Sequence, residues 1–268
     1  MLNPQGYLSI QDVTKSFASN GKPVVAIKDI HLDVKRGEFI SLIGHSGCGK
    51  STLLSIIAGL SQQTAGRITL NGKPITKPGP DRGVVFQNYS LLPWLSIWSN
   101  VYEAVDAVYA SKPRAEKHEL VDDFLRKVGL YEHRQKHPNQ ISGGMKQRVA
   151  IARAFATHPE VMLLDEPFGA LDALTRGSLQ DELMRMWAGD NQTETVIMVT
   201  HDIDEAIYLS DRIVVMMNGP AASIGEIINV DLPRPRDKQA LLHTAAWAQL
   251  KERLLYLLTV AYAHPVQV

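Results

Sequence analysis

Apolar and polar positions in the first third of this chain of 268 residues follow the twofold period of β-strands. The alternation slips once, between Ile27 and Ile30, which predicts a β-bulge. An Asn71-Gly72 pair within residues 66–73 predicts a tight hairpin turn. Two short apolar runs, at residues 38–43 and 84–86, predict further strands. The alternating positions are Val25, Ile27, Ile30, Leu32 and Val34.

The period becomes helical from about Pro93 to Pro159, and strand-like runs return after it at residues 161–165, 195–200 and 212–217. Strands that alternate with helices predict an α/β fold with a mainly parallel sheet and helices on both faces. The helical block is then an insertion into that core. Within it, one helix has a continuous apolar face and ends at Gly129; the face consists of Leu120, Val121, Phe124, Leu125 and Val128.

Residues 44–51 have the glycine spacing of a phosphate-binding loop between a strand and a helix. Glycines at three positions allow backbone N–H groups to turn inward around phosphate oxygens. We expect Lys50 to reach the β- and γ-phosphates and Ser51 to offer its hydroxyl to Mg²⁺. A chance match in a glycine-rich loop is the alternative. The strand before the loop and the apolar face of the next helix count against it; that face consists of Leu53, Leu54, Ile57 and Ala58.

Two other segments are candidates for a nucleotide site: a strand that ends in two carboxylates, and a glycine pair that opens a helix. The apolar run 161–164 ends in Asp165 and Glu166, and adjacent side chains on a strand point to opposite faces, so each carboxylate can have its own task. An ordinary acidic turn is the alternative. The Ser142-Gly143-Gly144 segment opens a helix, and by itself it is only an N-cap.

Composition limits the function. The formal net charge is zero, so no basic field favours nucleic acid, and we expect no nucleic-acid partner. Cys48 is the only cysteine, which excludes an intrachain disulfide and is consistent with a reducing compartment. The first residues lack the pattern of a signal peptide. The apolar stretch 254–263 has about half the length that crosses a bilayer.

These segments, with Gln87 and His201, occur in the order typical of ATP-binding cassette proteins, which the chain resembles over about residues 7–230. The branch that it resembles is the importer ATPases for nitrate, sulfonate, taurine and bicarbonate. The supporting segments are residues 141–148, residues 173–176 after Asp172, and residues 232–236. Within the branch it is most similar to the short nitrate-transport ATP-binding subunits, which lack a long solute-binding extension.

The resemblance implies the cassette fold: an ATPase domain over residues 1–230 with an N-terminal antiparallel β subdomain and a helical subdomain at about 93–159, followed by a C-terminal linker and helix at 231–268. It implies ATP and Mg²⁺ as cofactors, with Glu166 as the base and His201, Lys50 and Gln87 beside it in catalysis. Mg²⁺ ligands would be Ser51, Gln87 and Asp165. Nucleotide would contact Phe17, Gly44, His45, Ser46, Gly47, Cys48, Gly49, Lys50, Ser51, Thr52 and Gln87, and the partner's nucleotide Ser142, Gly143, Gly144 and Asp172.

Four of these residues have simpler alternatives. Phe17 is placed against adenine by the resemblance, but core packing would also explain an aromatic ring. Gln87 is expected at the end of a strand and would otherwise be a surface glutamine, and Asp172 would be only a helix-start residue. Cys48 is interpreted as filling space. Met145 stands where the family more often has glutamine. A methionine cannot donate an amide hydrogen bond, so packing is its expected role.

The resemblance also implies partners and a location. A second cassette subunit, either another copy of this chain or a longer companion, would complete the ATPase dimer. Transmembrane permease subunits would dock on this dimer. An extracytoplasmic solute-binding protein would act indirectly, through the permease. The chain would then be peripheral, at the cytoplasmic face of the inner membrane. The apolar run 91–95 is a candidate docking surface, with packing in a small core as the alternative. The C-terminal leucines are expected to pack on the fold or on a companion, and Arg234 and Arg236 to form ion pairs or to solubilise a linker.

The solute expected from the resemblance is a small inorganic anion, nitrate or nitrite first, with bicarbonate, cyanate, or sulfonate and taurine as alternatives. A non-transport cassette is disfavoured, because such proteins carry a basic surface or a second cassette. A regulatory ATP switch would be expected to lack the base, yet Glu166 is present.

Overall fold

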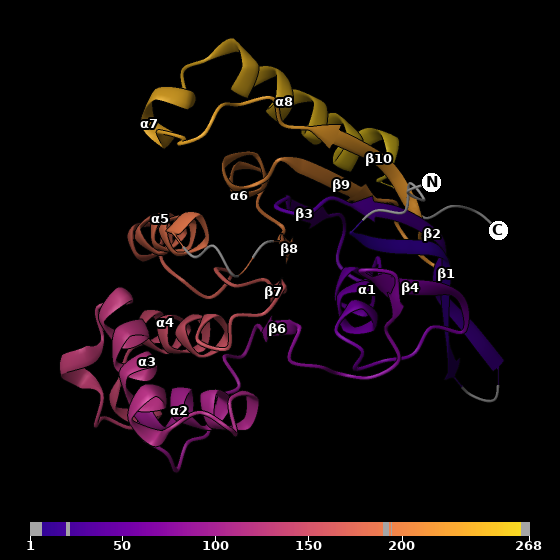
Figure 1. Ribbon diagram of the computed structural model, residues 1–268. Helices are drawn as coiled ribbons and strands as arrows, with labels where there is room; N and C mark the ends of the chain where they lie inside the picture. Colours follow the sequence, from indigo (N-terminus) through magenta and orange to yellow (C-terminus); the bar gives the residue numbers. More distant parts are fainter. Residues whose placement is uncertain (1–6, 20–21, 190–192, 194, 264–268) are drawn as a thin grey trace, which may run out of the picture. The chain divides into compact units, whose positions relative to one another are not determined.

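The computed structural model describes residues 7–19, 22–189, 193 and 195–263. The chain forms two compact units, which are described separately: Met1–Gly79 with Thr195–Val268, and Pro80–Glu194. Figure 1 shows the elements of both units in sequence colours.

The first unit contains an antiparallel sheet in the order β2-β1-β4-β5. Val13 pairs with Ile30 and Lys15 with Ile27, so β2 has one extra residue, and the predicted bulge is confirmed. Asn71 and Gly72 both have positive φ, as the predicted hairpin turn requires. The strands are β1 (Leu8–Ser19), β2 (Lys22–Val34), β4 (Ala65–Leu70) and β5 (Lys73–Pro74).

A second sheet of the same unit has the order β10-β9-β3-β8. Strand β3 is parallel to β8 and β9, and only β10 is antiparallel to its neighbour, as expected for a mainly parallel sheet. Helices α1 and α6 lie on opposite sides of β3 (Figure 1). The strands are β3 (Phe39–Ile43), β8 (Thr195–Val199), β9 (Arg212–Met216) and β10 (Ile224–Asn229). The helices are α1 (Lys50–Ile57), α6 (Ile203–Leu209), α7 (Lys238–Leu241) and α8 (Ala245–Tyr256), which continues as a π-helical segment, Leu257–Ala261.

The described residues of the second unit, 80–189 and 193, form two parallel strands and four α-helices. No strand occurs between residues 93 and 159, so the predicted change of period is confirmed. The strand expected at residues 84–86 instead spans β6 (Arg82–Val85); Val85 forms the last pair, with Leu164, and Phe86 beyond it is exposed. The remaining elements are α2 (Ile97–Val108), α3 (Arg114–Lys127), α4 (Gly143–Phe155), β7 (Val161–Asp165), α5 (Ala173–Gly189) and two 3₁₀ turns, Tyr131–His133 and Pro138–Gln140.

The apolar face predicted for the helix now seen as α3 is buried at four of its five positions, and Leu120 is half-buried. The helix ends where expected, because Gly129 adopts φ +65°, a left-handed conformation that suits glycine. The buried positions are Val121, Phe124, Leu125 and Val128.

Arg234 and Arg236 hold the segment after β10 in place. Arg234 forms an ion pair with Asp211 at 2.8 Å, so the ion-pair prediction is confirmed. Only 2% of the Arg236 side chain is exposed, and its guanidinium donates to the last carbonyls of α6 and to carbonyls of its own segment. The acceptors are the carbonyls of Ile207, Tyr208, Ser210, Val230 and Leu232. This segment is therefore docked on the fold.

The C-terminal helix packs on the fold as predicted, but Leu242, one of the leucines expected to pack, is exposed. Trp247, Leu254 and Leu257 are buried, and α8 packs against α6. Across the described ranges, no helix combines the length and hydrophobicity that crossing a bilayer requires.

Arg236→Met should lower the free energy of unfolding by about 2–4 kcal/mol, because it leaves several buried carbonyls without a donor. Arg253→Met is the matched control, since Arg253 is half exposed and its guanidinium pairs with the Glu226 carboxylate rather than with buried carbonyls. Urea unfolding of both variants tests this. Equal stability of Arg236→Met and wild type would contradict the assignment.

Candidate functional site

The phosphate loop of the first unit leaves β3 and enters α1, and at two of its glycines neighbouring atoms leave no room for a side chain. A Cβ on Gly44 would lie 2.8 Å from both the Cys48 sulfur and the Met216 carbonyl oxygen. A Cβ on Gly49 would lie 2.2 Å from the Ile27 side chain, and both glycines have positive φ. The loop backbone is thus packed against its surroundings, in the curled conformation that a phosphate cradle needs.

Lys50 occupies the inside of this loop. It is the first residue of α1 and is 4% exposed. Its ammonium donates to the carbonyl oxygens of Gly44 at 2.8 Å and His45 at 2.9 Å. The cation is therefore held where phosphate oxygens are expected. Ser46, Gly47 and Ser51 of the same loop are exposed, and Thr52 is half-buried.

Cys48 fits its interpretation as a space-filling residue. The side chain is buried, and burial raises the pKa of its thiol despite the neighbouring Lys50 ammonium at 3.6 Å. A buried thiol with a raised pKa is a poor nucleophile.

Phe17 lies on β1 with 46% of the residue exposed, and the Lys15 ammonium lies 5.0 Å from its ring centroid. The core-packing alternative is therefore wrong for this side chain. An exposed ring keeps a free face for stacking against a planar group.

His201 follows β8 and is exposed, between two residues that fix the start of α6. The Thr200 hydroxyl donates to Glu205 at 2.6 Å and accepts from the Asp202 amide at 3.0 Å. Asp202 caps the helix by accepting from the Glu205 amide at 3.1 Å. The backbone of His201 is thus held on both sides.

The carboxylates of the second unit differ from the expected arrangement. β7 ends at Asp165, and Glu166 has left the strand with φ +47°. The expectation that both side chains alternate on one strand is therefore wrong for Glu166. A left-handed glutamate costs on the order of 1–3 kcal/mol, and such residues are typical of functional sites.

Gln87 explains how the Glu166 side chain is held. Gln87 lies two residues beyond the end of β6, not at its end as expected, and it is exposed. Its amide nitrogen donates to a Glu166 carboxylate oxygen at 2.9 Å. No local sequence pattern indicates this pair, because 79 residues separate its members.

The glycine pair at residues 143–144 begins α4, and Ser142 caps that helix by accepting from the Met145 amide at 3.3 Å. A Cβ on Gly144 would lie 2.7 Å from a Thr175 methyl group, and one on Gly143 would lie 3.4 Å from the Tyr89 hydroxyl. Gly144 is therefore required by close packing against α5 as well as by any ligand.

Asp172 likewise caps α5, since its carboxylate accepts from the amides of Leu174 at 3.1 Å and Thr175 at 3.0 Å. The hydrogen bonds from Thr175, its side chain first, lower the pKa of Asp172. The cap keeps this carboxylate ionised and its loop fixed.

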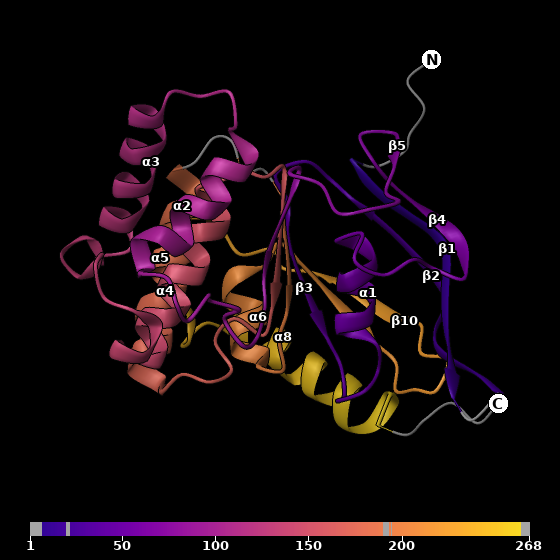
Figure 2. The same cartoon turned by 90° about the horizontal axis from the view of Figure 1, so that it is seen from below.

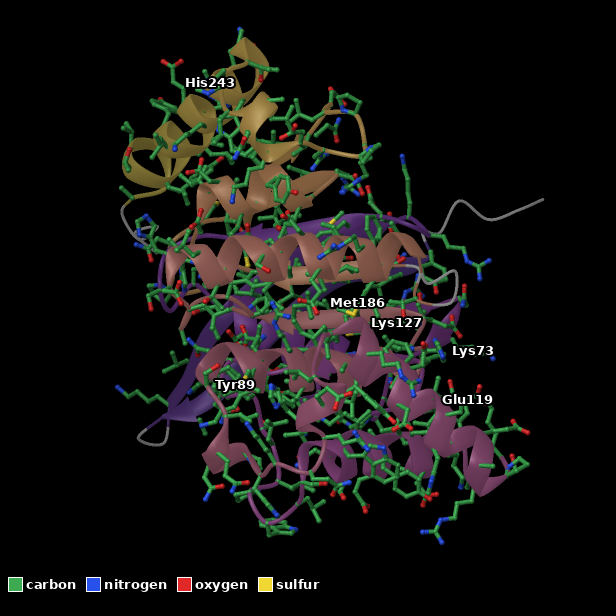
Figure 3. The ribbon with its side chains drawn as sticks, turned by 90° about the vertical axis from the view of Figure 1, so that its left-hand side faces the viewer. Lys73, Tyr89, Glu119, Lys127, Met186 and His243 are labelled. Atoms are coloured by element: carbon green, nitrogen blue, oxygen red, sulfur yellow. The ribbon has the colours of Figure 1, made fainter. Side chains whose placement is uncertain are left out.

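The segment that follows Gln87 is strained and clamped. Tyr89, labelled in Figure 3, and Ser90 both have positive φ. Arg153 of α4 donates to their carbonyl oxygens at 3.0 Å and 2.6 Å, and burial lowers the pKa of Arg153. Sequence reasoning missed Arg153; its position in the apolar C-terminal half of α4, residues 149–155, was the available signal.

Trp94, in the same segment, is 69% exposed. Packing in a small core is therefore wrong for its side chain, and the exposed indole is consistent with the alternative of a docking surface.

Comparison with known proteins identifies the family. The family model described as ABC transporter matches residues 27–169. The nitrate import ATP-binding protein NrtD of Synechococcus elongatus is 52% identical over 97% of this chain and 94% of its own length. The bicarbonate transport ATP-binding protein CmpD of Synechocystis is 51% identical over 96% of this chain and 91% of its own length.

A solved structure shows the same fold. The post-hydrolysis dimer of the ATP-binding cassette MJ0796, bound to ADP and Pi, matches with a TM-score of 0.74 and 31% identity over 84% of this chain and all of its own. These matches agree with the order of the motifs and with the two sheets, one mainly parallel and one antiparallel. The chain therefore belongs to the ABC transporter family, as one of its ATPase subunits.

Proposed function

We propose that this chain hydrolyses ATP to drive import of a small inorganic anion, nitrate or nitrite. The observation that carries the ATPase part is the glycine loop curled around the Lys50 ammonium. The solute is inferred from the relatives alone, and a bicarbonate transport protein is nearly as similar as a nitrate import protein. Bicarbonate is therefore the second candidate.

In this proposal the phosphate loop binds the triphosphate. Amides of residues 44–52 donate to phosphate oxygens, and the dipole of α1 adds to the attraction. The Lys50 ammonium exchanges its two carbonyl acceptors for β- and γ-phosphate oxygens. The exposed ring of Phe17 stacks on adenine, for about 1 kcal/mol and with little base selectivity.

The residues also fit Mg²⁺, which prefers hard oxygen ligands. We assign its ligands as the Ser51 hydroxyl, the Asp165 carboxylate and the Gln87 amide oxygen, since the Gln87 amide nitrogen already donates to Glu166. When bound, the ion would neutralise charge that develops on the phosphates.

Hydrolysis is assigned to Glu166 as the base that accepts a proton from the attacking water. The hydrogen bond from Gln87 orients its carboxylate, so a change at Gln87 is transmitted directly to the base. His201 donates a hydrogen bond to the γ-phosphate. The protein otherwise contributes position and charge, as in other phosphoryl transfers.

A second ATPase subunit completes the site in this proposal. Ser142, Gly143 and Gly144 offer a hydroxyl, amides and a helix N-terminus to the partner's γ-phosphate, and Asp172 lies at the seam. The relatives include NrtC and CmpC, for which the match spans only 38% of their length, so a longer companion is a candidate for this role. Permease subunits span the inner membrane, this chain docks on them at the cytoplasmic face, and an extracytoplasmic solute-binding protein acts through them.

The solute is tested by reconstituting the membrane complex with its solute-binding protein in vesicles. Nitrate should stimulate ATP hydrolysis, and bicarbonate should not. Stimulation by bicarbonate alone would replace the first candidate by the second, and no stimulation by either anion would contradict both.

Glu166→Gln should reduce ATP turnover by orders of magnitude while ATP binding persists, because shape is kept and the proton acceptor is lost. An ATP-stabilised dimer should accumulate, which size-exclusion chromatography would detect. Glu119→Gln makes the same chemical change at an exposed position on α3 (Figure 3) and should leave turnover unchanged. Near-normal hydrolysis by Glu166→Gln would exclude Glu166 as the base.

Trp94→Ala should weaken assembly with the permease subunits, because an exposed tryptophan is a typical interface anchor whose truncation costs about 2 kcal/mol or more of binding free energy. The melting temperature and ATP affinity of the isolated chain should stay the same. Full recovery of an active complex would defeat the docking assignment, and parallel loss of stability and ATP binding would return Trp94 to a packing role.

A further inference from the structure

The phosphate loop touches the C-terminal part of the chain through one side chain. His45, the second residue of the loop, is half-buried, and its Nε2 lies 2.6 Å from the carbonyl oxygen of Leu258. A carbonyl only accepts, so Nε2 carries the proton and donates. In Figure 2 the C-terminal end of α8 lies beside the loop that joins β3 to α1.

The Leu258 carbonyl is available because the helix widens there. Residues Leu257–Ala261 form a π-helical segment, in which the Tyr262 amide donates to the Leu257 carbonyl at 2.8 Å. Carbonyls in the last turn of a helix need partners from outside the helix, and π segments are frequent at functional sites. The His45 imidazole supplies that partner.

This segment is firmly attached to the first unit. Its first residue, Leu257, is buried, and so is Leu254, which precedes it on α8. The Tyr262 ring lies so close to Gly225 of β10 that a Cβ there would be 2.5 Å from it. Asn218 donates to the Ala263 carbonyl at 3.0 Å. The acceptor of His45 is therefore held by contacts with β10 and with the segment between β9 and β10.

On the other side, His45 is bound to the reactive cation. Its own carbonyl oxygen accepts from the Lys50 ammonium at 2.9 Å. His45 thus connects Leu258, through its imidazole, with Lys50, through its backbone carbonyl. When Lys50 turns to a phosphate, the loop loses that internal bond, and the contact with Leu258 still restrains His45.

We propose that His45 is a positioning residue, through which the π-helical C-terminal segment keeps the phosphate loop in its binding conformation. The inference rests on the proposed nucleotide site. Its physical basis is preorganisation: a loop that is already ordered loses less conformational entropy when the ligand binds. The segment then acts on ATP affinity more than on the chemical step.

Four variants of the full-length chain separate this role from others. His45→Ala removes the donor, whereas His45→Gln keeps an amide N–H that can reach the same carbonyl. Tyr262→Ala loosens the segment without touching the loop. Tyr256→Ala is the matched control, because this tyrosine of α8 is half exposed.

Two measurements are made on each variant: ATP affinity in the presence of Mg²⁺ by calorimetry, and hydrogen exchange of the loop amides without nucleotide. His45→Ala and Tyr262→Ala should each weaken ATP binding by about three- to tenfold, the worth of one hydrogen bond. Both should speed exchange of the loop amides. His45→Gln should largely restore wild-type values, and Tyr256→Ala should match wild type.

The double variant His45→Ala/Tyr262→Ala should be no worse than the poorer single variant, because both remove the same restraint. Additive losses would mean that His45 contacts the nucleotide independently, and would overturn the proposal. Unchanged ATP affinity and exchange in His45→Ala would overturn it as well. Failure of the wild-type chain to bind ATP would instead contradict the proposed function.

Discussion

The inward-curled backbone of the phosphate loop around the Lys50 ammonium is the interaction on which the rest of the first unit depends. A buried cation needs acceptors, and the carbonyls of Gly44 and His45 provide them. That conformation requires glycine at positions 44 and 49, where neighbouring atoms exclude a side chain. It also places the ammonium where a triphosphate is expected. Lys50 thus stabilises the empty loop and prepares it for the ligand.

The second unit likewise holds strained residues in place by hydrogen bonds. Glu166 lies outside the strand in a strained conformation, and Gln87 holds its carboxylate by one hydrogen bond. Arg153 holds the next strained residues by their carbonyl oxygens. The segment that carries Gln87 is therefore attached both to the proposed base and to the helix that begins at Ser142. A displacement of this segment would therefore move both the Glu166 carboxylate and the helix that begins at Ser142.

The sequence alone predicted the fold class, the bulge, the hairpin turn and the loop between β3 and α1, because these depend on local periodicity and glycine spacing. It did not predict the left-handed Glu166, since a strand pattern says nothing of the residue that follows the strand. It left the roles of Phe17 and Trp94 open, because exposure is a property of the packed chain. Arg153, Arg236 and the contact of His45 with Leu258 join distant segments, and no local pattern encodes such pairs.

The central claim is that Lys50, inside its loop, is the principal cation for the triphosphate. Calorimetric titration of ATP and Mg²⁺ into the wild-type chain and into Lys50→Met tests it most directly, with circular dichroism to verify that both are folded. The account predicts that the folded variant binds ATP at least about tenfold more weakly, since a charge-assisted hydrogen bond is lost. A folded Lys50→Met chain that binds ATP as tightly as wild type would contradict it.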